Sequence, residues 1–404
     1  MNAVSEAEAK YNTSGAAEVR APSDVVSAGA RRRVHKGARA VFLVLLFLAA
    51  AASMFVIRLV GGELSLSGFT RTLNIFAGQG GNAVFVFEDG FDEVFADLGG
   101  AVVSAGKSGV AVYAKTGEEL SRESFAMANP AIISGGALAI AYDAGGRGVR
   151  IADRSGIVAS MTLDSGVVSC AAGRGGIFAV TTRASGEYKG RVEFFAMRSG
   201  VPEKIYDWYS GEGPVLGAAI SRSGKRFAAL TLTARGGRIV LLERGSTTPT
   251  GEYVYENGAI FEMAFTASGA LLARAGDALI SISESGAGEV IFAFNGHKPD
   301  GYATGDSFAA LHLTGPAGGE LVTVDERGVV LGRIETSRGL IWLSAEGDRV
   351  AVLRSDGLDI YDRELRLAAS YPEASGASNA FPRGGKSAVV TGAREGRAFN
   401  GQDS

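Results

Sequence analysis

The sequence predicts an all-β fold: a β-propeller of eight four-stranded blades, with seven blades as the alternative. Glycine is abundant, with 58 residues among 404, whereas proline is scarce at nine. A glycine followed by a short apolar run recurs about every 40 residues, and an alternating strand pattern follows each of the first seven copies. A unit of four short strands with this period is typical of a propeller blade.

The repeating unit is marked by a glycine just before a run of small and aliphatic residues. These glycines are Gly100, Gly136, Gly176, Gly224, Gly269, Gly305, Gly347 and Gly385. Runs that are apolar on both faces and bounded by turn glycines indicate strands buried between neighbouring sheets. The many tight turns also account for the glycine content, because they need positive φ angles that glycine adopts easily.

Each unit is expected to contain four strands. One precedes the glycine, one follows it, and the third alternates in polarity, as in Val110-Ala111-Val112. The fourth is a return strand such as residues 119–125 or 289–294. A helical solenoid of similar period would space its apolar residues by 3.6, and no such spacing is present.

The two ends of the repeat region predict how the ring closes. The eighth unit, at Gly385, has no clear copy of the alternating strand and is followed only by residues 394–400. An unmatched strand, Ala83 to Phe87, stands before the first unit. We expect this strand to complete the last blade, which would leave no open sheet edge.

An apolar run near the N-terminus predicts a membrane anchor. Residues 40–57 carry no charge, and as a helix they would span about 27 Å. Cationic residues precede the run, namely Arg31, Arg32, Arg33, His35, Lys36 and Arg39. Because cationic flanks stay in the cytoplasm, we expect a single-pass protein of the cell membrane, with its N-terminus cytoplasmic and its propeller outside. A cleaved secretory signal and a buried core helix are the alternatives.

The predicted organisation has four parts. Residues 1–38 are a disordered cytoplasmic tail with a basic flank, and residues 39–61 are a transmembrane signal-anchor helix. Residues 62–81 form a stalk, and residues 82–400 form the propeller.

Composition narrows the classes of function. The formal net charge is −3, which gives no reason to expect nucleic acid as a partner. Cys170 is the only cysteine, so neither an intrachain disulfide nor a cysteine-based metal site is possible. We expect Cys170 to be a small buried side chain in a strand.

No catalytic or metal-binding residues are predicted, and no cofactor. The chain lacks a Gly-x-Ser-x-Gly nucleophile elbow, and its histidines, His35, His297 and His312, have no metal-ligand spacing. His312 lies in the apolar run of residues 308–313, where we expect a packed or hydrogen-bonded strand residue.

Two segments, residues 206–212 and 294–300, are candidates for ligand or partner binding. Each is expected to link the outer strand of one blade to the inner strand of the next, beside the central funnel. The candidate residues are Asp207, Trp208, Tyr209, Asn295, His297 and Lys298. The alternative is that both segments are solvated connections with one aromatic ring packed onto a blade.

The repeats resemble quinoprotein-type propellers, whose rhythm of glycines and strands residues 100–117 follow loosely. The combination of anchor and propeller also resembles an uncharacterised bacterial family of membrane-anchored, propeller-like proteins of unknown function. The quinone-dependent dehydrogenases among such propellers use adjacent cysteines, tryptophan-rich docking motifs and a calcium site. This chain has one cysteine and two distant tryptophans, Trp208 and Trp342, so the resemblance implies the fold and not the quinone chemistry.

The function expected from these observations is a binding or scaffolding module for protein or envelope ligands. The alternative is an enzyme with a site in the funnel: a hydrolase, a lyase or a degenerate quinoprotein-like oxidoreductase. Sensing across the membrane ranks last, because residues 1–38 contain no recognisable output motif.

Overall fold

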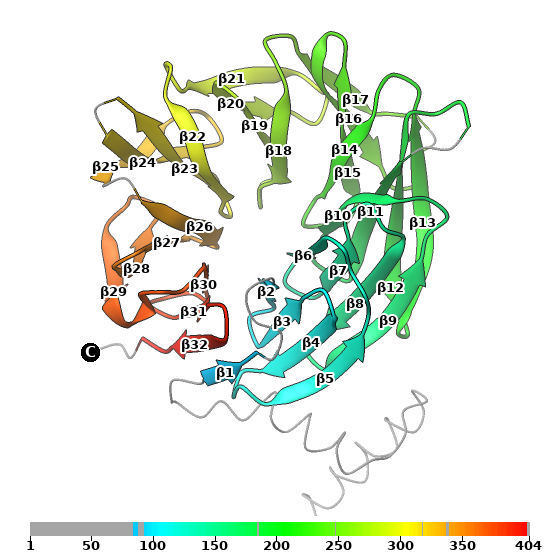
Figure 1. Cartoon of the computed structure of the whole chain (residues 1–404). Coiled ribbons are helices and arrows are strands. Elements are labelled where there is room, and N and C mark those ends of the chain that lie inside the picture. Colours follow the sequence, from blue (N-terminus) through cyan, green and yellow to red (C-terminus); the bar gives the residue numbers. More distant parts are fainter. Residues whose placement is uncertain are drawn as a thin grey trace, which may run out of the picture. The chain divides into compact units, whose positions relative to one another are not determined.

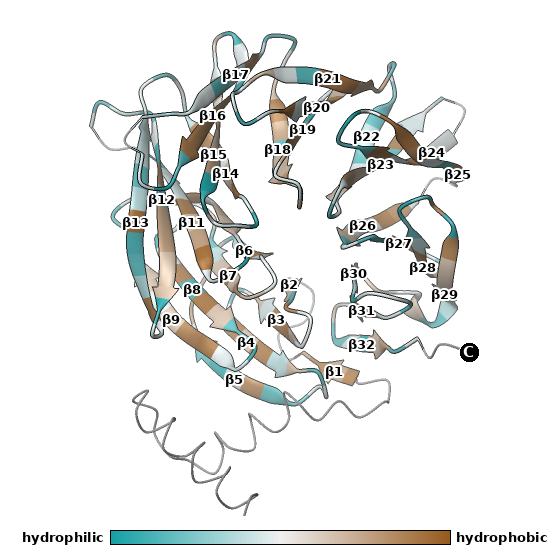
Figure 2. Ribbon diagram, turned by 180° about the vertical axis from the view of Figure 1, so that it is seen from behind, coloured by the Kyte–Doolittle hydropathy of each residue, from teal (hydrophilic) through white to brown (hydrophobic). Residues whose placement is uncertain are grey.

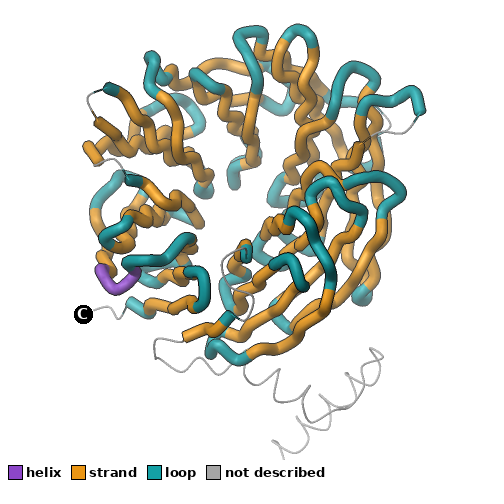
Figure 3. The backbone as a smooth tube through the Cα atoms, viewed as in Figure 1, coloured by secondary structure: helices purple, strands orange, loops and turns teal. Residues whose placement is uncertain are grey.

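The computed structural model describes residues 84–87, 93–183, 186–246, 248–316, 318–336 and 339–401. The predicted tail, anchor and stalk, residues 1–81, lie outside these ranges and stay predictions. Within the described ranges, no helix has the length and apolar character needed to cross a membrane. The regular structure there consists of 32 strands and one short 3₁₀-helix, η1 (Pro372–Ala374), which Figure 3 shows as the single helical turn.

The strands form eight four-stranded antiparallel sheets, the blades, arranged around a centre (Figure 1). The innermost strands of blades 1 to 8 are β2 (Val94–Asp97), β6 (Pro130–Ser134), β10 (Val167–Ala172), β14 (Val215–Ile220), β18 (Ile260–Phe265), β22 (Lys298–Thr304), β26 (Leu340–Glu346) and β30 (Asn379–Pro382). The second strands are β3 (Ala101–Ala105), β7 (Ala139–Asp143), β11 (Ile177–Arg183), β15 (Arg226–Thr233), β19 (Leu271–Ala275), β23 (Phe308–Gly315), β27 (Arg349–Arg354) and β31 (Ala388–Thr391).

The third strands are β4 (Gly109–Ala114), β8 (Gly148–Asp153), β12 (Gly190–Arg198), β16 (Gly236–Glu243), β20 (Ala278–Ile282), β24 (Gly318–Asp325), β28 (Gly357–Asp362) and β32 (Glu395–Phe399). The outermost strands are β5 (Glu119–Ser124), β9 (Gly156–Thr162), β13 (Val201–Ser210), β17 (Gly251–Tyr255), β21 (Gly288–Ala293), β25 (Val330–Thr336), β29 (Leu367–Tyr371) and, for blade 8, β1 (Val84–Val86). The four-strand unit predicted from the repeats is therefore confirmed.

The repeated glycines stand in the turns that lead into the second strands. Six of the eight have φ angles between +55° and +96°, the region that glycine enters at least cost. The second strands that follow are almost wholly buried, as in β3, where all five residues are buried. The sequence pattern thus marks the turn and the strand that the neighbouring blades cover.

The hydrophobic core is divided into eight clusters, one at each junction between neighbouring blades. Between blades 5 and 6, for example, Leu272 and Leu279 pack with Leu311 and Val322. Hydrophobic colouring follows the strands, and hydrophilic colouring gathers in the loops and turns (Figure 2). Each blade buries both faces against its neighbours, so a closed ring is the arrangement that satisfies all of them.

The ring closes through strands from the two ends of the propeller. β1 pairs antiparallel with β32, with Phe85 opposite Gly396, and so completes blade 8. Phe85 is fully buried in the cluster between blades 8 and 1. A buried ion pair also joins these blades, because Arg383 lies 3.1 Å through Nε from both carboxylate oxygens of Asp97. The prediction of eight blades with an N-terminal closing strand is confirmed.

Candidate functional site

The innermost strands of five consecutive blades, blades 3 to 7, carry a β-bulge near their start. One residue there has no partner in the second strand. A bulge re-aims the side chain of the extra residue and often lies beside a functional site. The bulged residues are Val168, Leu216, Phe261, Asp300 and Ile341. We call this set the entrance collar.

The entrance collar lies at one end of the central axis of the ring. In a blade of four antiparallel strands, the chain returns from the outermost strand to the next innermost strand on the same face each time. All innermost strands, which surround the centre in Figure 1, therefore begin at that face, and the five bulges lie near it. The collar exposes Phe261 at 58%, Ile341 at 42% and Leu216 at 36%. Single exposed apolar residues are common, but here they recur at the same bulge position in blades 4, 5 and 7.

Asp300 is the one charged member of the collar, and a hydrogen-bonded chain holds its carboxylate. Asp300 Oδ1 bonds Nδ1 of His312, and Nε2 of His312 lies 2.6 Å from the hydroxyl of Thr336. The His312 side chain is only 1% exposed, whereas that of Asp300 is 43% exposed. The prediction of His312 as a hydrogen-bonded strand residue is confirmed.

The His312 ring reaches Thr336 by passing over a glycine. His312 lies on β23 and Thr336 on β25, with β24 between them. A Cβ at Gly319 of β24 would lie only 3.0 Å from the Thr336 hydroxyl and 3.1 Å from the His312 ring. The missing side chain leaves room for a hydrogen-bonded chain that connects the innermost and outermost strands of blade 6.

An acid, an imidazole and a hydroxyl in this order also occur in nucleophilic triads. Here the imidazole is buried, and its Nε2 is occupied by Thr336. Among the described residues, no group of three or more His, Cys, Asp or Glu side chains is placed to hold a metal ion. The arrangement thus fixes the Asp300 carboxylate in orientation while leaving it accessible.

At the opposite end of the ring's axis, four charged side chains form a network of ion pairs, which we call the ion-pair bar. Its members are Arg174, Arg222, Asp306 and Glu346. Arg222 Nη2 lies 2.6 Å from Asp306 Oδ1, and Arg174 Nη2 lies 3.1 Å from Glu346 Oε1. Arg174 also lies 3.8 Å from Asp306. Each residue follows or ends an innermost strand, so the bar lies at the far end of those strands from the collar.

The ion-pair bar joins opposite sides of the ring. Arg174 belongs to blade 3 and Glu346 to blade 7, which are opposite each other in a ring of eight. The side chains are 36–60% exposed, so each pair contributes about 0–1 kcal/mol. A cluster of charged side chains at a funnel mouth is what a funnel enzyme needs, but here the charges neutralise one another.

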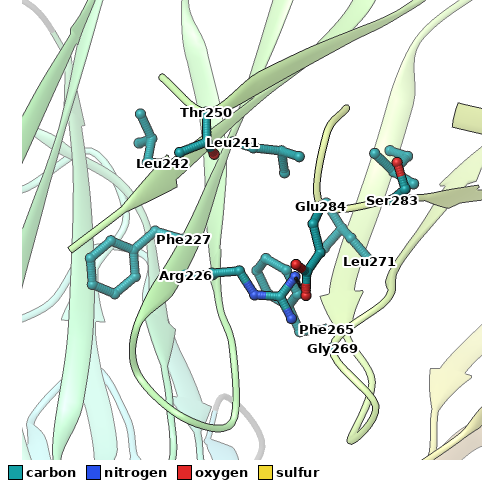
Figure 4. A pocket seen from close by; sticks show the side chains of 11 residues that line it. Arg226, Phe227, Leu241, Leu242, Thr250, Phe265, Gly269, Leu271, Ser283 and Glu284 are labelled. Atoms are coloured by element: carbon teal, nitrogen blue, oxygen red, sulfur yellow. Dashed lines mark ion pairs between the residues drawn. The ribbon is translucent and has the colours of Figure 1, made fainter. Parts of the chain in front are cut away.

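Figure 4 shows a pocket between blades 4 and 5, which is too small to hold a ligand. Arg226 and Glu284 form an ion pair of 2.7 Å at its edge, and the Arg226 guanidinium lies 5.6 Å from the Phe265 ring. The free space of about 10 Å³ is enough for about one water molecule. We interpret this pocket as packing between blades.

One half of the predicted binding residues lies in a strand and not in the expected connection between blades. Asp207, Trp208 and Tyr209 lie within β13, the outermost strand of blade 3, and not in a loop beside the channel. β12 and β13 are unusually long, so the strand continues through the segment that was expected to be a connection. The expected position of these three residues is wrong, and their binding role stays an untested prediction.

The other half lies where it was expected. Asn295 and His297 are in the crossing from β21 to β22, and Lys298 begins β22, two residues before Asp300. His297 packs beside Gly315, and its backbone N–H donates to the carbonyl of Phe294 at 3.0 Å. Two whole blades, 4 and 5, separate this crossing from the one that follows β13, so the structure does not bring the two halves together. Their binding role also stays a prediction.

Cys170, which was expected to be buried, is partly buried. It lies in β10 among the apolar residues between blades 2 and 3. Burial raises the pKa of its thiol, so it stays protonated at neutral pH and is a poor nucleophile.

Comparisons with known proteins agree with the fold. A sequence model described as a family of unknown function (DUF5711) matches residues 84–391, and no curated protein matches the chain by sequence.

Sqt1 of Saccharomyces cerevisiae is similar in structure, with 11% identity and a TM-score of 0.59 over 80% of this chain and 100% of that one. The C-terminal WD40 domain of Sif2 has 14% identity and a TM-score of 0.52 over 77% and 100%. BamB from Moraxella catarrhalis has 15% identity and a TM-score of 0.49 over 80% and 99%. At identities this low, the first two similarities show the propeller fold and nothing about ligands.

Proposed function

Because this chain belongs to DUF5711, a family of unknown function, its role has to be inferred from its own geometry, and we propose that it is a binding or scaffolding module. The partner, a protein or envelope ligand, docks at the entrance collar. The observation that carries this proposal is the recurrence of exposed apolar residues at one bulge position in blades 4, 5 and 7. Binding sites are commonly concave and apolar with a few fixed polar groups.

The setting of this module is also a proposal. The uncharged run of residues 40–57 and the cationic residues before it support a single-pass membrane anchor with the propeller outside the cytoplasm. The test is protease protection of the full chain in intact spheroplasts and in inverted membrane vesicles. Digestion of the propeller in spheroplasts and protection in inverted vesicles is expected, and the reverse pattern overturns the orientation.

Docking at the collar is tested by site-specific photo-cross-linking in native membranes. A photoreactive benzoyl-phenylalanine at Leu216 or Ile341 is expected to give discrete cross-linked species. The matched control is Val201 on β13, which is 59% exposed but lies on the outer rim. Phe261→Asp, introduced with the photoreactive residue at Leu216, is expected to lower the yield. Equal products from Val201, or none from the collar, would count against this site.

The enzyme alternative is supported by one observation, the Asp300–His312–Thr336 chain. If Thr336 acted as a nucleophile, a fluorophosphonate probe would label the chain, and Thr336→Val would abolish the label. We expect no such label, because the hydroxyl is engaged by a buried ring. Labelling that is lost in Thr336→Val would replace the binding proposal with a hydrolase.

A further inference from the structure

We propose that the entrance collar recognises a lysine side chain carried on an apolar segment of the partner protein, with Asp300 as the acceptor of its ammonium group. This inference rests on the proposed binding function and adds the chemistry of the partner. It is carried by the position of Asp300 in the collar, by the way its carboxylate is held, and by its neighbours.

The first step is the contrast between Asp300 and the equivalent positions. The bulged residue is apolar in blades 3, 4, 5 and 7, and it is a carboxylate only in blade 6. A ligand seated on this rim therefore meets apolar contacts on several sides and a single negative charge on one. Charge complementarity calls for one cation on an otherwise apolar segment.

The second step is that the carboxylate is already oriented for a ligand. His312 holds Oδ1, and Thr336 in turn holds the His312 ring. Oδ2 of Asp300 makes no hydrogen bond to any residue that the structure describes. The Asp300 side chain is 43% exposed. Because the acceptor is fixed before binding, little conformational freedom is lost when a cation arrives.

The third step concerns the cations of the protein itself. Arg274, on the neighbouring blade, is engaged by Glu262 at 2.6 Å. Lys298 is exposed two residues before Asp300, and no ion pair joins the two in the described structure. Among the described residues, His312 is therefore the one side chain that is paired with Asp300, and no lysine or arginine among them is.

The fourth step distinguishes lysine from arginine. A guanidinium binds a carboxylate best through both oxygens at once, whereas an ammonium is a compact charge that needs one. Since His312 occupies Oδ1, Asp300 offers one free oxygen. A lysine also has a long apolar stem, which suits an apolar collar residue on an adjacent blade such as Ile341, which is 42% exposed. The ring of Phe261, on the other adjacent blade, already lies 5.2 Å from the guanidinium of Arg274.

The experiment measures binding of three short peptides to the full chain in nanodiscs by isothermal titration calorimetry. The peptides are acetyl-Leu-Lys-Leu-amide and its analogues with arginine or norleucine in the middle. We expect the lysine peptide to bind about tenfold more tightly than the norleucine peptide, the ratio that about 1.4 kcal/mol represents. The arginine peptide should be weaker than the lysine peptide.

Two substitutions complete the experiment. Asp300→Asn keeps an oxygen that accepts from His312 but removes the charge, so it should abolish the preference for lysine and leave the norleucine peptide unaffected. The matched control, Asp348→Asn, removes an exposed carboxylate at the other end of the channel and should change nothing. The lysine preference should also weaken as salt is raised from 0.05 to about 0.5 M.

The outcomes separate this inference from the function on which it rests. Equal binding of the lysine and norleucine peptides, with Asp300→Asn without effect, overturns the cation inference and leaves apolar docking standing. Arginine binding as tightly as lysine overturns the single-oxygen argument. If none of the peptides binds and the collar gives no cross-links, the proposed function fails as well.

Discussion

At the scale of single residues, the buried ion pair between Asp97 and Arg383 should contribute strongly to ring closure. The side chains are only 9% and 8% exposed and belong to different ends of the propeller. Replacing Asp97 by Asn leaves the guanidinium buried without its counter-charge, which costs about 3–5 kcal/mol. The measurement is the free energy of urea unfolding of the purified chain.

A matched control is available on the same blade as Arg383. Glu395 and Arg397 form an ion pair of 2.7 Å, but their side chains are 54% and 43% exposed. Glu395→Gln should therefore change stability by less than about 1 kcal/mol. If both substitutions have the same small effect, burial of the Asp97 pair is not what stabilises the junction.

Tyr255 predicts a pH dependence. Burial, together with the hydrogen bond of 2.7 Å that its hydroxyl donates to Asp277, raises the pKa of Tyr255 to about 12 from an ordinary value of 10.0. The folded state therefore holds this proton more tightly than the unfolded state. The resulting stability is complete below pH 10 and is lost as the pH rises from 10 to about 12.

The substitution Tyr255→Phe isolates this effect. The phenolate absorbance at 295 nm, as the difference between wild type and variant, should rise near pH 12. Thermal unfolding of the variant should decline less steeply than that of the wild type between pH 10 and 12. If the difference in absorbance instead rises near pH 10, burial and the hydrogen bond to Asp277 do not raise the pKa of Tyr255.

At the scale of the element, the repeated glycines serve two different purposes. Gly136 has a φ of +83° and no neighbouring atom within 4 Å of a Cβ. Gly305, at the equivalent position of blade 6, has no positive φ, but a Cβ would lie 2.3 Å from the Phe308 ring. The first glycine is needed for its backbone angle and the second for space.

These two glycines predict different responses to alanine. Gly136→Ala should cost about 1–2 kcal/mol, the strain of a left-handed residue, with no rearrangement of the core. Gly305→Ala should displace Phe308, which is fully buried, and change the methyl and aromatic NMR signals of blade 6. If Gly136→Ala perturbs packing as much as Gly305→Ala does, the separation into angle and space is wrong.

The elements also show how far the sequence could predict the fold. The second strands were predictable because their glycine and apolar run recur in every blade, and each is buried by both neighbours. The placement of Asp207 and Tyr209 was not, because an aromatic and polar segment fits an exposed outermost strand as well as a loop. No local sequence pattern marks the bulges. The difference between Asp300 and the other collar residues can be recognised only when the innermost strands of the blades are aligned.

At the scale of the whole molecule, the two ends of the central axis of the ring differ in chemistry. The collar end is apolar with one oriented carboxylate, and the other end is crossed by the ion-pair bar. The bar joins residues from four blades that are up to 172 positions apart in sequence. No local pattern could have predicted it, because the pairs exist only once the ring places blades 3 and 7 opposite each other.

Closure by β1 predicts how the ring fails. Phe85 is fully buried between blades 8 and 1, and Phe308 is fully buried between blades 6 and 7. Either substitution to alanine should cost about 3–5 kcal/mol.

Phe85→Ala should also release β1 and expose the edge of β32, so that the chain self-associates through strand pairing. We expect faster hydrogen exchange confined to blades 8 and 1, together with oligomers in light scattering, for Phe85→Ala. Phe308→Ala has no free edge to release and should stay monodisperse. Oligomers from both variants, or from neither, would mean that β1 is not the weak point of the ring.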